Sequence, residues 1–344
     1  MPDRVTWLIP IKNGMPYLSE TLASIEAQTY KNWEVLVWDN GSTDGTIEEL
    51  KKWIPERLPG KVIISEPSTV GGSLARMVEI CLTEFCARID ADDINLPERL
   101  EKQVEFLSNH PEIAVVGSQI DPIDEKGMRK EYSLPMPLNH DDILHGMLSG
   151  NPISHPSVLF RRSAILQVGN YRDLANIEDY DLWLRVAQQY KIANLDRHLL
   201  EYRIHESSTT ILAIRENRLK KVVDDGICSN APLSFGCSES DMRLLREKSH
   251  PFAFRPILQI AKYLQQNQGG NLSDRLNSAS FIDNAKHFIS SRDVISLLLL
   301  GVRHPDQLFI CREIKMILKS ILKKVPGLTK TLDLYRNLNT SHKA

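Results

Sequence analysis

The sequence lacks the cysteine pattern of a disulfide framework or a zinc site. Its 344 residues include five cysteines, an odd number, with no C-x-x-C pair and no histidine at zinc-finger spacing. Reduced and mostly buried thiols are therefore expected. The sequence also has no large excess of positive or negative residues, because its formal net charge is only −2. The chain therefore has no global field that would recruit nucleic acid.

Long hydrophobic runs are missing as well. The N-terminus has no apolar stretch of signal-peptide length, and the run at residues 294–302 is interrupted by Ser296. A membrane-spanning helix needs about 20 apolar residues. With 42% hydrophobic and 25% charged residues, the composition is that of an ordinary globular protein. We therefore expect a cytoplasmic protein.

The first 120 residues do contain a regular alternation of short apolar runs with segments of helical period. Strands are predicted over residues 5–11, 33–38, 61–64 and 87–89, and helices over residues 16–28, 46–53, 73–86 and 97–108. This series predicts an α/β fold with a mostly parallel sheet covered by helices on both faces. Ligands of such sheets bind beyond the carboxyl ends of the strands, where Pro10, Asp39 and Asp90 are predicted to lie.

The densest chemical signal is Asp90-Ala91-Asp92-Asp93, with three carboxylates in four positions after a predicted strand. Their mutual repulsion requires compensation by a cation or by hydrogen bonds. Carboxylate oxygens are ligands that Mg²⁺ and Mn²⁺ prefer, and such a cation can bridge the oxygens of a diphosphate. The alternative is a cap for the helix at residues 97–108, but capping needs one oxygen acceptor, and Asn95 is better placed for it.

Four motifs together resemble the family 2 glycosyltransferases of GT-A (Rossmann-like) fold. They are the strand with Pro10, the run 38–46, the acidic cluster, and Glu178-Asp179 with the segment after it. They occur in the family's order and cover roughly residues 4 to 210. The resemblance implies a GT-A catalytic domain over residues 1–215, followed by a mainly helical region over residues 216–344.

The resemblance also implies an activity. It is the transfer of a sugar, with inversion, from a nucleotide-diphosphate sugar to a saccharide or lipid-linked saccharide acceptor. The donor is expected to be UDP-linked and the cofactor to be Mg²⁺ or Mn²⁺. The implied setting is the synthesis of a cell-surface polysaccharide or glycoconjugate.

Individual roles follow from the same resemblance. Asp179, with Glu178 beside it, would be the general base that takes the proton of the acceptor hydroxyl. Asp92 would bind the metal, and Asp90 would be shared between metal and ribose. Asp39 would accept the N3–H of uracil. Asp93 is given only a supporting role.

One position departs from the family's pattern, because Asn40 stands where the second acid of an Asp-Asp pair is usual. No role is therefore assigned to residue 40. The run 41–45 also has the residues of a turn and helix start, with Thr43 or Asp44 as the cap. Turn chemistry and base recognition do not exclude each other.

Basic and histidine side chains complete the implied nucleotide-sugar site. Arg76, on a helix that opens at Gly71-Gly72, would lie near the diphosphate, or else be an ordinary surface arginine. His205 would approach the metal or diphosphate from a strand end, with Arg203 a weaker candidate. His155 would contact acceptor or phosphate, or be a hydrogen-bonded structural histidine.

Past residue 215 the resemblance fades. Residues 308–325 combine apolar residues at helical spacing with several lysines, which predicts a basic amphipathic helix. Such a helix lies on an anionic membrane surface or packs on the catalytic domain. Many relatives act on lipid-linked acceptors, which favours peripheral attachment at the inner face of the plasma membrane.

Two other functions remain open. A sugar nucleotidyltransferase would be expected to carry a glycine-rich basic loop after the first strand, and residues 10–14 do not supply one. A non-catalytic module that binds nucleotide sugars or membranes would require the acidic motifs to be relics.

Overall fold

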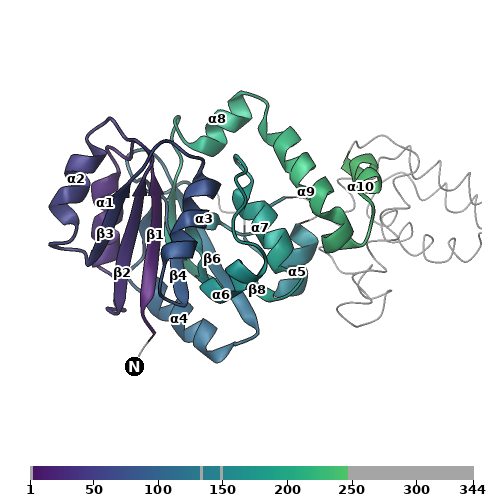
Figure 1. Cartoon of the computed structure of the whole chain (residues 1–344), viewed down its shortest axis with the longest axis horizontal. Coiled ribbons are helices and arrows are strands. Elements are labelled where there is room, and N and C mark those ends of the chain that lie inside the picture. Colours follow the sequence, from purple (N-terminus) through teal and green to yellow (C-terminus); the bar gives the residue numbers. More distant parts are fainter. Residues whose placement is uncertain (1–2, 132–134, 148–149, 247–344) are drawn as a thin grey trace, which may run out of the picture. The chain divides into compact units, whose positions relative to one another are not determined.

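The computed structural model describes residues 3–131, 135–147 and 150–246 (Figure 1). The predicted amphipathic helix at residues 308–325 lies outside the described residues. The chain divides into two compact units, residues 1–230 and 231–344, and the candidate site lies in the first. The predicted domain boundary at residue 215 stays a prediction.

The chain alternates between strands and helices over most of its described length. The strands are β1 Val5–Ile11, β2 Trp33–Asp39, β3 Gly60–Ile64, β4 Phe85–Arg88, β5 Ile94–Asn95, β6 Ile113–Ile123, β7 Leu159–Arg161 and β8 Lys191–Arg203. The helices are α1 Leu18–Glu26, α2 Thr46–Trp53, α3 Val70–Ile80, α4 Arg99–Asn109, α5 His140–Gly146, α6 Arg162–Gln167, α7 Glu178–Val186, α8 Thr209–Arg215, α9 Leu219–Phe235 and α10 Glu239–Arg246. A membrane-spanning helix, judged by length and apolar character, is absent from the described part of the chain.

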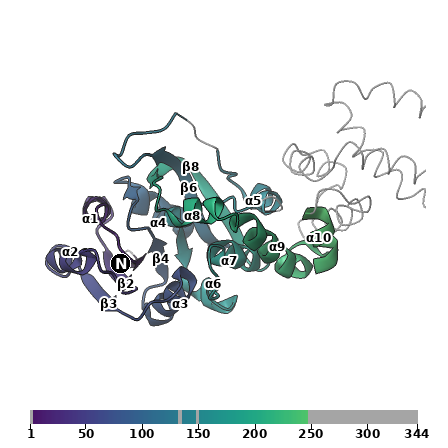
Figure 2. The ribbon, with the colours of Figure 1, turned by 90° about the horizontal axis from the view of Figure 1, so that it is seen from above.

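The strands form one sheet in the order β3-β2-β1-β4-β7-β6-β8-β5. The first four strands are parallel, as is the pair β6 and β8. β7 runs antiparallel to β4 and β6, and β5 antiparallel to β8, so the whole sheet is mixed. Helices cover both faces, with α1 and α4 on one side and α3 and α6 on the other (Figure 2). The predicted α/β class is confirmed.

The core is formed by the apolar strands of the sheet and by the apolar faces of the helices that cover it. All seven residues of β1 are buried, as expected for a parallel strand with helices on both faces. Leu18, Leu22 and Ile25 are fully buried on one face of α1, at the spacing that predicted this helix.

The helix predicted over residues 73–86 is wrong at both ends. α3 begins at Val70, where the hydroxyl of Thr69 accepts the N–H of Gly72 at 3.0 Å, and it ends at Ile80. Residues 85 and 86 instead begin β4, which continues through residues 87 and 88 of the predicted strand, and all four residues are buried between β1 and β7. Continuous burial within the sheet outweighs helical spacing in so short a segment.

Two predicted caps also differ in the structure. Gly45, with φ of 94°, stands at the N-cap of α2, although Asp44 still accepts the N–H of Thr46 at 3.1 Å. Asn95 does not cap α4: it lies in β5, where its amide oxygen accepts a hydrogen bond from Arg99. This buried pairing competes with capping, and Glu98 takes the N-cap position.

The register of the sheet aligns the strand ends that carry polar residues. Pro10 of β1 lies opposite Trp38, and Ile11 lies opposite Asp39 at the end of β2. On the other side of β1, Leu8 lies opposite Arg88, two residues before Asp90. The three segments therefore end at one edge of the sheet.

Candidate functional site

Asp39 is a fully buried carboxylate at the end of β2. Its Oδ2 accepts the N–H groups of Gly41 and Ser42, both at 3.1 Å. Its Oδ1 is buried and has no hydrogen-bond partner among the described residues. Since an unpaired buried acceptor is costly, this oxygen is suited to a donor supplied by a ligand.

The turn after β2 holds the loop after β1 in place. Four hydrogen bonds of 2.8–2.9 Å join them, from Asn13 N to Ser42 Oγ, Gly14 N to Thr46 Oγ1, Met15 N to Asp44 Oδ2, and Thr43 N to Asn13 Oδ1. The amide oxygen of Asn40 accepts a hydrogen bond of 2.9 Å from Ser73 on α3. The run 39–46 is thus a turn and helix start that also braces the site.

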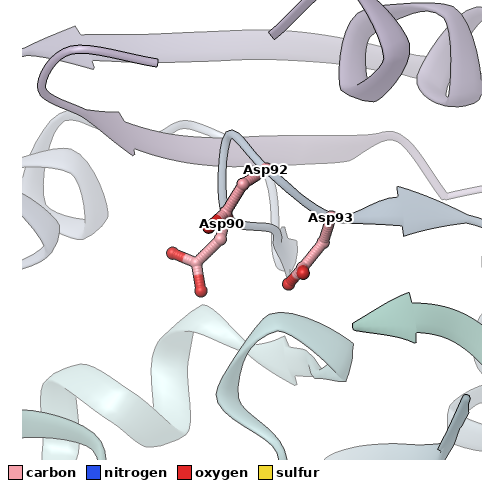
Figure 3. A group of neighbouring side chains, drawn as sticks. All are labelled: Asp90, Asp92 and Asp93. Atoms are coloured by element: carbon pink, nitrogen blue, oxygen red, sulfur yellow. The ribbon is translucent and has the colours of Figure 1, made fainter. Parts of the chain in front are cut away.

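Three carboxylates gather on the turn after β4. Figure 3 shows Asp90, Asp92 and Asp93, which each offer an oxygen within 4.8 Å of the other two. Asp93 is fully buried, whereas the side chains of Asp90 and Asp92 keep 35% and 28% of their surface exposed. Burial and then the neighbouring acids raise the pKa of Asp93 well above its usual range. Its buried Oδ2 has no hydrogen-bond partner among the described residues.

Positive and imidazole groups surround this turn. Arg88, only 3% exposed, pairs with Asp90. The Nε2 atom of His205 lies 2.8 Å from Oδ2 of Asp92. Two partly exposed carboxylates, one unpaired buried carboxylate oxygen and an imidazole form a donor set that fits Mg²⁺ or Mn²⁺.

Glu178 and Asp179 form the first turn of α7, as predicted for a helix start. Oδ2 of Asp179 accepts a hydrogen bond of 2.7 Å from the amide of Asn151, and Oδ1 accepts the N–H of Tyr180 at 2.7 Å. Burial raises the pKa of Asp179 to about 6. Burial, followed by the charge of Asp179, raises the pKa of Glu178 to about 8. Each of the two acids therefore holds a proton more tightly than a free carboxylate does.

His155 is a buried histidine beside this pair. Its Nε2 hydrogen-bonds the hydroxyl of Tyr171 at 2.9 Å, and its Nδ1 lies 4.0 Å from Oδ2 of Asp179. Burial lowers its pKa well below the usual range, so the ring is neutral. Trp183, fully buried, meets the His155 ring edge-on, which is a packing role.

Arg76 and the glycine pair lie on α3, and the predicted diphosphate contact of Arg76 stays a prediction. Arg76 is exposed on α3, and no hydrogen bond or ion pair joins it to the acidic turn within the described residues. A Cβ at Gly71 would lie 2.4 Å from the carbonyl oxygen of Arg172 and 2.9 Å from the Cβ of Glu178. This glycine therefore permits close approach to the first turn of α7. Pro10 is buried in β1.

Two residues at the site were missed by sequence reasoning. Arg88 carries a charge inside a short apolar strand, which is the signal that could have identified it. Asn151 precedes a proline in an irregular segment, where no periodic pattern marks its contact with Asp179.

Known proteins are similar to this chain in sequence. The family model described as Glycosyl transferase family 2 matches residues 6–169. The putative glycosyltransferase EpsE of Bacillus subtilis (strain 168) is 33% identical over 211 residues, which cover 60% of this chain and 74% of that protein. The amylovoran biosynthesis glycosyltransferase AmsE of Erwinia amylovora is 34% identical over 189 residues, which cover 54% of this chain and 70% of that protein. The chain belongs to glycosyltransferase family 2.

This family 2 glycosyltransferase also resembles a solved structure. The crystal structure of S. aureus TarS 1-349 in complex with UDP-GlcNAc matches with a TM-score of 0.57 and 15% identity, over 92% of this chain and 90% of that one. At this identity the likeness concerns the fold, and it agrees with the predicted GT-A-like arrangement.

Proposed function

We propose that the protein transfers a sugar, with inversion, from a UDP-sugar to a saccharide or lipid-linked saccharide, using Mg²⁺ or Mn²⁺. The observation that carries the proposal is the grouping, at one sheet edge, of an unpaired buried oxygen on Asp39 and the acidic turn. The name of AmsE, an amylovoran biosynthesis glycosyltransferase, supports a role in polysaccharide or glycoconjugate synthesis. The UDP-GlcNAc bound in the TarS complex supports a UDP-linked donor.

The nucleotide end of the donor fits the Asp39 side of the site. The free Oδ1 accepts the N3–H of uracil, because it is buried and its companion oxygen is already engaged by two main-chain donors. Cytosine has no hydrogen at that position and would leave the oxygen unpaired. Pro10, at the end of the adjoining strand, lines the same edge.

The diphosphate end fits the acidic turn. Asp90 and Asp92 would hold the divalent cation, with the imidazole of His205 beside the carboxylate of Asp92. When bound, such a cation neutralises the charge that develops on the leaving diphosphate. Arg88 holds Asp90 in place through its ion pair.

The acceptor side is served by Asp179. Its carboxylate removes the proton of the acceptor hydroxyl while that oxygen forms its bond to the anomeric carbon, and the bond from that carbon to the diphosphate oxygen breaks. Burial raises the pKa of Asp179 above its usual range, which strengthens its affinity for the proton of the acceptor hydroxyl. Attack opposite the leaving diphosphate inverts the anomeric configuration.

A thermal-shift panel of nucleotide sugars tests the donor assignment. With Mn²⁺ present, one UDP-sugar should raise the melting temperature most, since a ligand at 100 times its Kd adds about 2.7 kcal/mol of stability. Chelation of the metal should reduce that shift. A panel without any shift would contradict the proposal.

Two assays separate the other candidate functions. Release of pyrophosphate from a nucleoside triphosphate and a sugar phosphate would identify a nucleotidyltransferase instead. A UDP-sugar that binds with Mn²⁺ but is neither transferred nor hydrolysed would identify a non-catalytic binding module.

We further propose that the basic amphipathic segment attaches the enzyme to the inner face of the plasma membrane. The proposal rests on the lysines at Lys315, Lys319 and Lys323, interleaved with apolar residues. The full chain should sediment with anionic vesicles in low salt, and the triple replacement by glutamate should remain in solution. Equal sedimentation of both proteins would contradict membrane attachment.

A further inference from the structure

Arg203, the last residue of β8, has its guanidinium group bonded to three separate segments. The side chain is 1% exposed, and its Nε donates to the carbonyl oxygen of Asp92 at 2.8 Å. One terminal nitrogen donates to Glu20 on α1 at 2.6 Å, and the other to the carbonyl oxygens of Asp124 and Glu125, both at 3.3 Å.

We propose that Arg203 is the positioning residue of the metal site, holding the acidic turn in the geometry that a divalent cation and a diphosphate require. The inference rests on the proposed function. Arg203 contacts neither substrate nor metal in this role: it acts through Asp92 and Asp93.

The main chain of Arg203 adds a contact that prepares Asp93. Its N–H donates to Oδ1 of Asp93 at 2.8 Å, which leaves the buried Oδ2 of that residue without a partner among the described residues. Oδ1 of Asp93 is thereby fixed to β8, and Oδ2 stays available for the metal site.

Asp92 is held from two directions by the same strand end. Arg203 binds its carbonyl oxygen, and His205, two residues later, reaches its carboxylate at 2.8 Å. The ring of Tyr17 lies against both residues, 4.6 Å from the guanidinium carbon and 5.0 Å from the imidazole centre. Orientation of the turn therefore depends on where β8 ends.

An arginine is required for this arrangement by its shape. The planar guanidinium presents five donors in a rigid fork and reaches the three segments at once. The ammonium group of lysine is a compact point charge on a flexible stem and could not keep all of these bonds. Replacing Arg203 by lysine keeps the positive charge and removes the planar fork of donors that bonds the three segments.

The test compares Arg203→Lys with the wild-type full chain. Mn²⁺ binding is measured by electron paramagnetic resonance titration at saturating UDP, together with the Mn²⁺ dependence of transfer. We expect the Mn²⁺ affinity to fall by about 10-fold or more, as for other groups that orient metal ligands. At saturating Mn²⁺, kcat should recover most of its wild-type value, because Arg203 does not touch the reacting atoms.

Arg161→Lys is the matched control. Arg161 also bonds main-chain carbonyls through its guanidinium, those of Ile113 at 3.1 Å and Leu107 at 2.7 Å, but none on the acidic turn. This variant should lose stability and keep wild-type Mn²⁺ affinity. A folded Arg203→Lys protein with wild-type Mn²⁺ affinity would overturn the positioning role.

A second variant covers the case in which Arg203→Lys does not fold. Glu20 is more than half exposed, so Glu20→Gln should fold while weakening one anchor of the guanidinium. We expect Mn²⁺ affinity to fall by about threefold, the size of one exposed ion pair. Unchanged affinity in that variant would count against the proposal. Failure of the wild-type protein to bind Mn²⁺ with UDP would instead overturn the proposed function, and the positioning role with it.

Discussion

Each carboxylate oxygen of Asp179 accepts a hydrogen bond, which fixes the plane of the proposed base. The N–H of Tyr180 occupies Oδ1, and the amide of Asn151 occupies Oδ2. Asn151 is itself oriented, because its amide oxygen accepts the N–H of Ile153 at 3.1 Å. The neutral ring of His155 closes the buried side of the carboxylate.

Replacing Asn151 by alanine should therefore slow transfer. The loss of one hydrogen bond to a charged group is expected to lower kcat by about 10-fold. The KM for the donor should change little, since the hydrogen bonds of the Asn151 side chain among the described residues go to Asp179 and Ile153 and not to the acidic turn or Asp39. Steady-state kinetics check this, with Asn139→Ala, whose side chain accepts the N–H of Asp142, as the control. An unchanged kcat would show that this hydrogen bond does not orient the base.

The raised pKa of Glu178 predicts how stability depends on pH. Its value moves from 4.5 to about 8, chiefly through burial, so between these values the folded state binds more protons than the unfolded state. Stability should consequently fall as pH rises from about 4.5 to about 8. In Glu178→Gln that part of the slope should disappear. Urea unfolding at several pH values measures the free energy of unfolding as a function of pH. The same pH dependence in Glu178→Gln and in the wild type would contradict the raised pKa.

At the scale of elements, the sequence predicted the strands and helices whose period is long and regular. β1, β2, α1 and α2 lie within two residues of the predicted bounds. The prediction of a helix failed at residues 81–86; residues 85 and 86 belong to β4, where burial between two strands decides the structure and local spacing does not. Such information lies in the partners of a segment and cannot be read from the segment itself.

The same limit applies to the site. Asp39, the acidic turn and Glu178-Asp179 were found because each motif is contiguous in sequence. Arg203 was only a weaker candidate from the sequence, because its contacts with distant segments, such as that with Asp93 110 positions away, leave no short sequence pattern.

The packing of α3 against α7 gives a prediction at this scale. Gly71→Ala should destabilise the protein and displace the first turn of α7, because the new Cβ would meet the main chain of Arg172 at 2.4 Å. Transfer should fall more than donor binding. Gly72→Ala is the milder control, since its Cβ meets first the hydroxyl of Ser68, which can rotate away. Equal effects of the two substitutions on turnover would contradict this account.

Across the whole molecule, the sheet brings together residues from distant parts of the sequence. β1 lies between β2 and β4, so the segments carrying Asp39 and Asp90 end on either side of it. α7 supplies the Asp179 carboxylate, and β8 supplies Arg203 and leads into His205. Donor, metal and base functions are thus assigned to separate elements around one sheet edge.

That separation makes Asp179→Asn the most direct test of the central claim. The variant keeps the shape of the side chain and removes the base, so UDP-sugar binding with Mn²⁺ should stay close to wild type. Transfer should fall by about 10²–10⁴-fold, the usual contribution of a general base. The measurement is product formation alongside calorimetric donor binding. Wild-type turnover in Asp179→Asn would contradict the account.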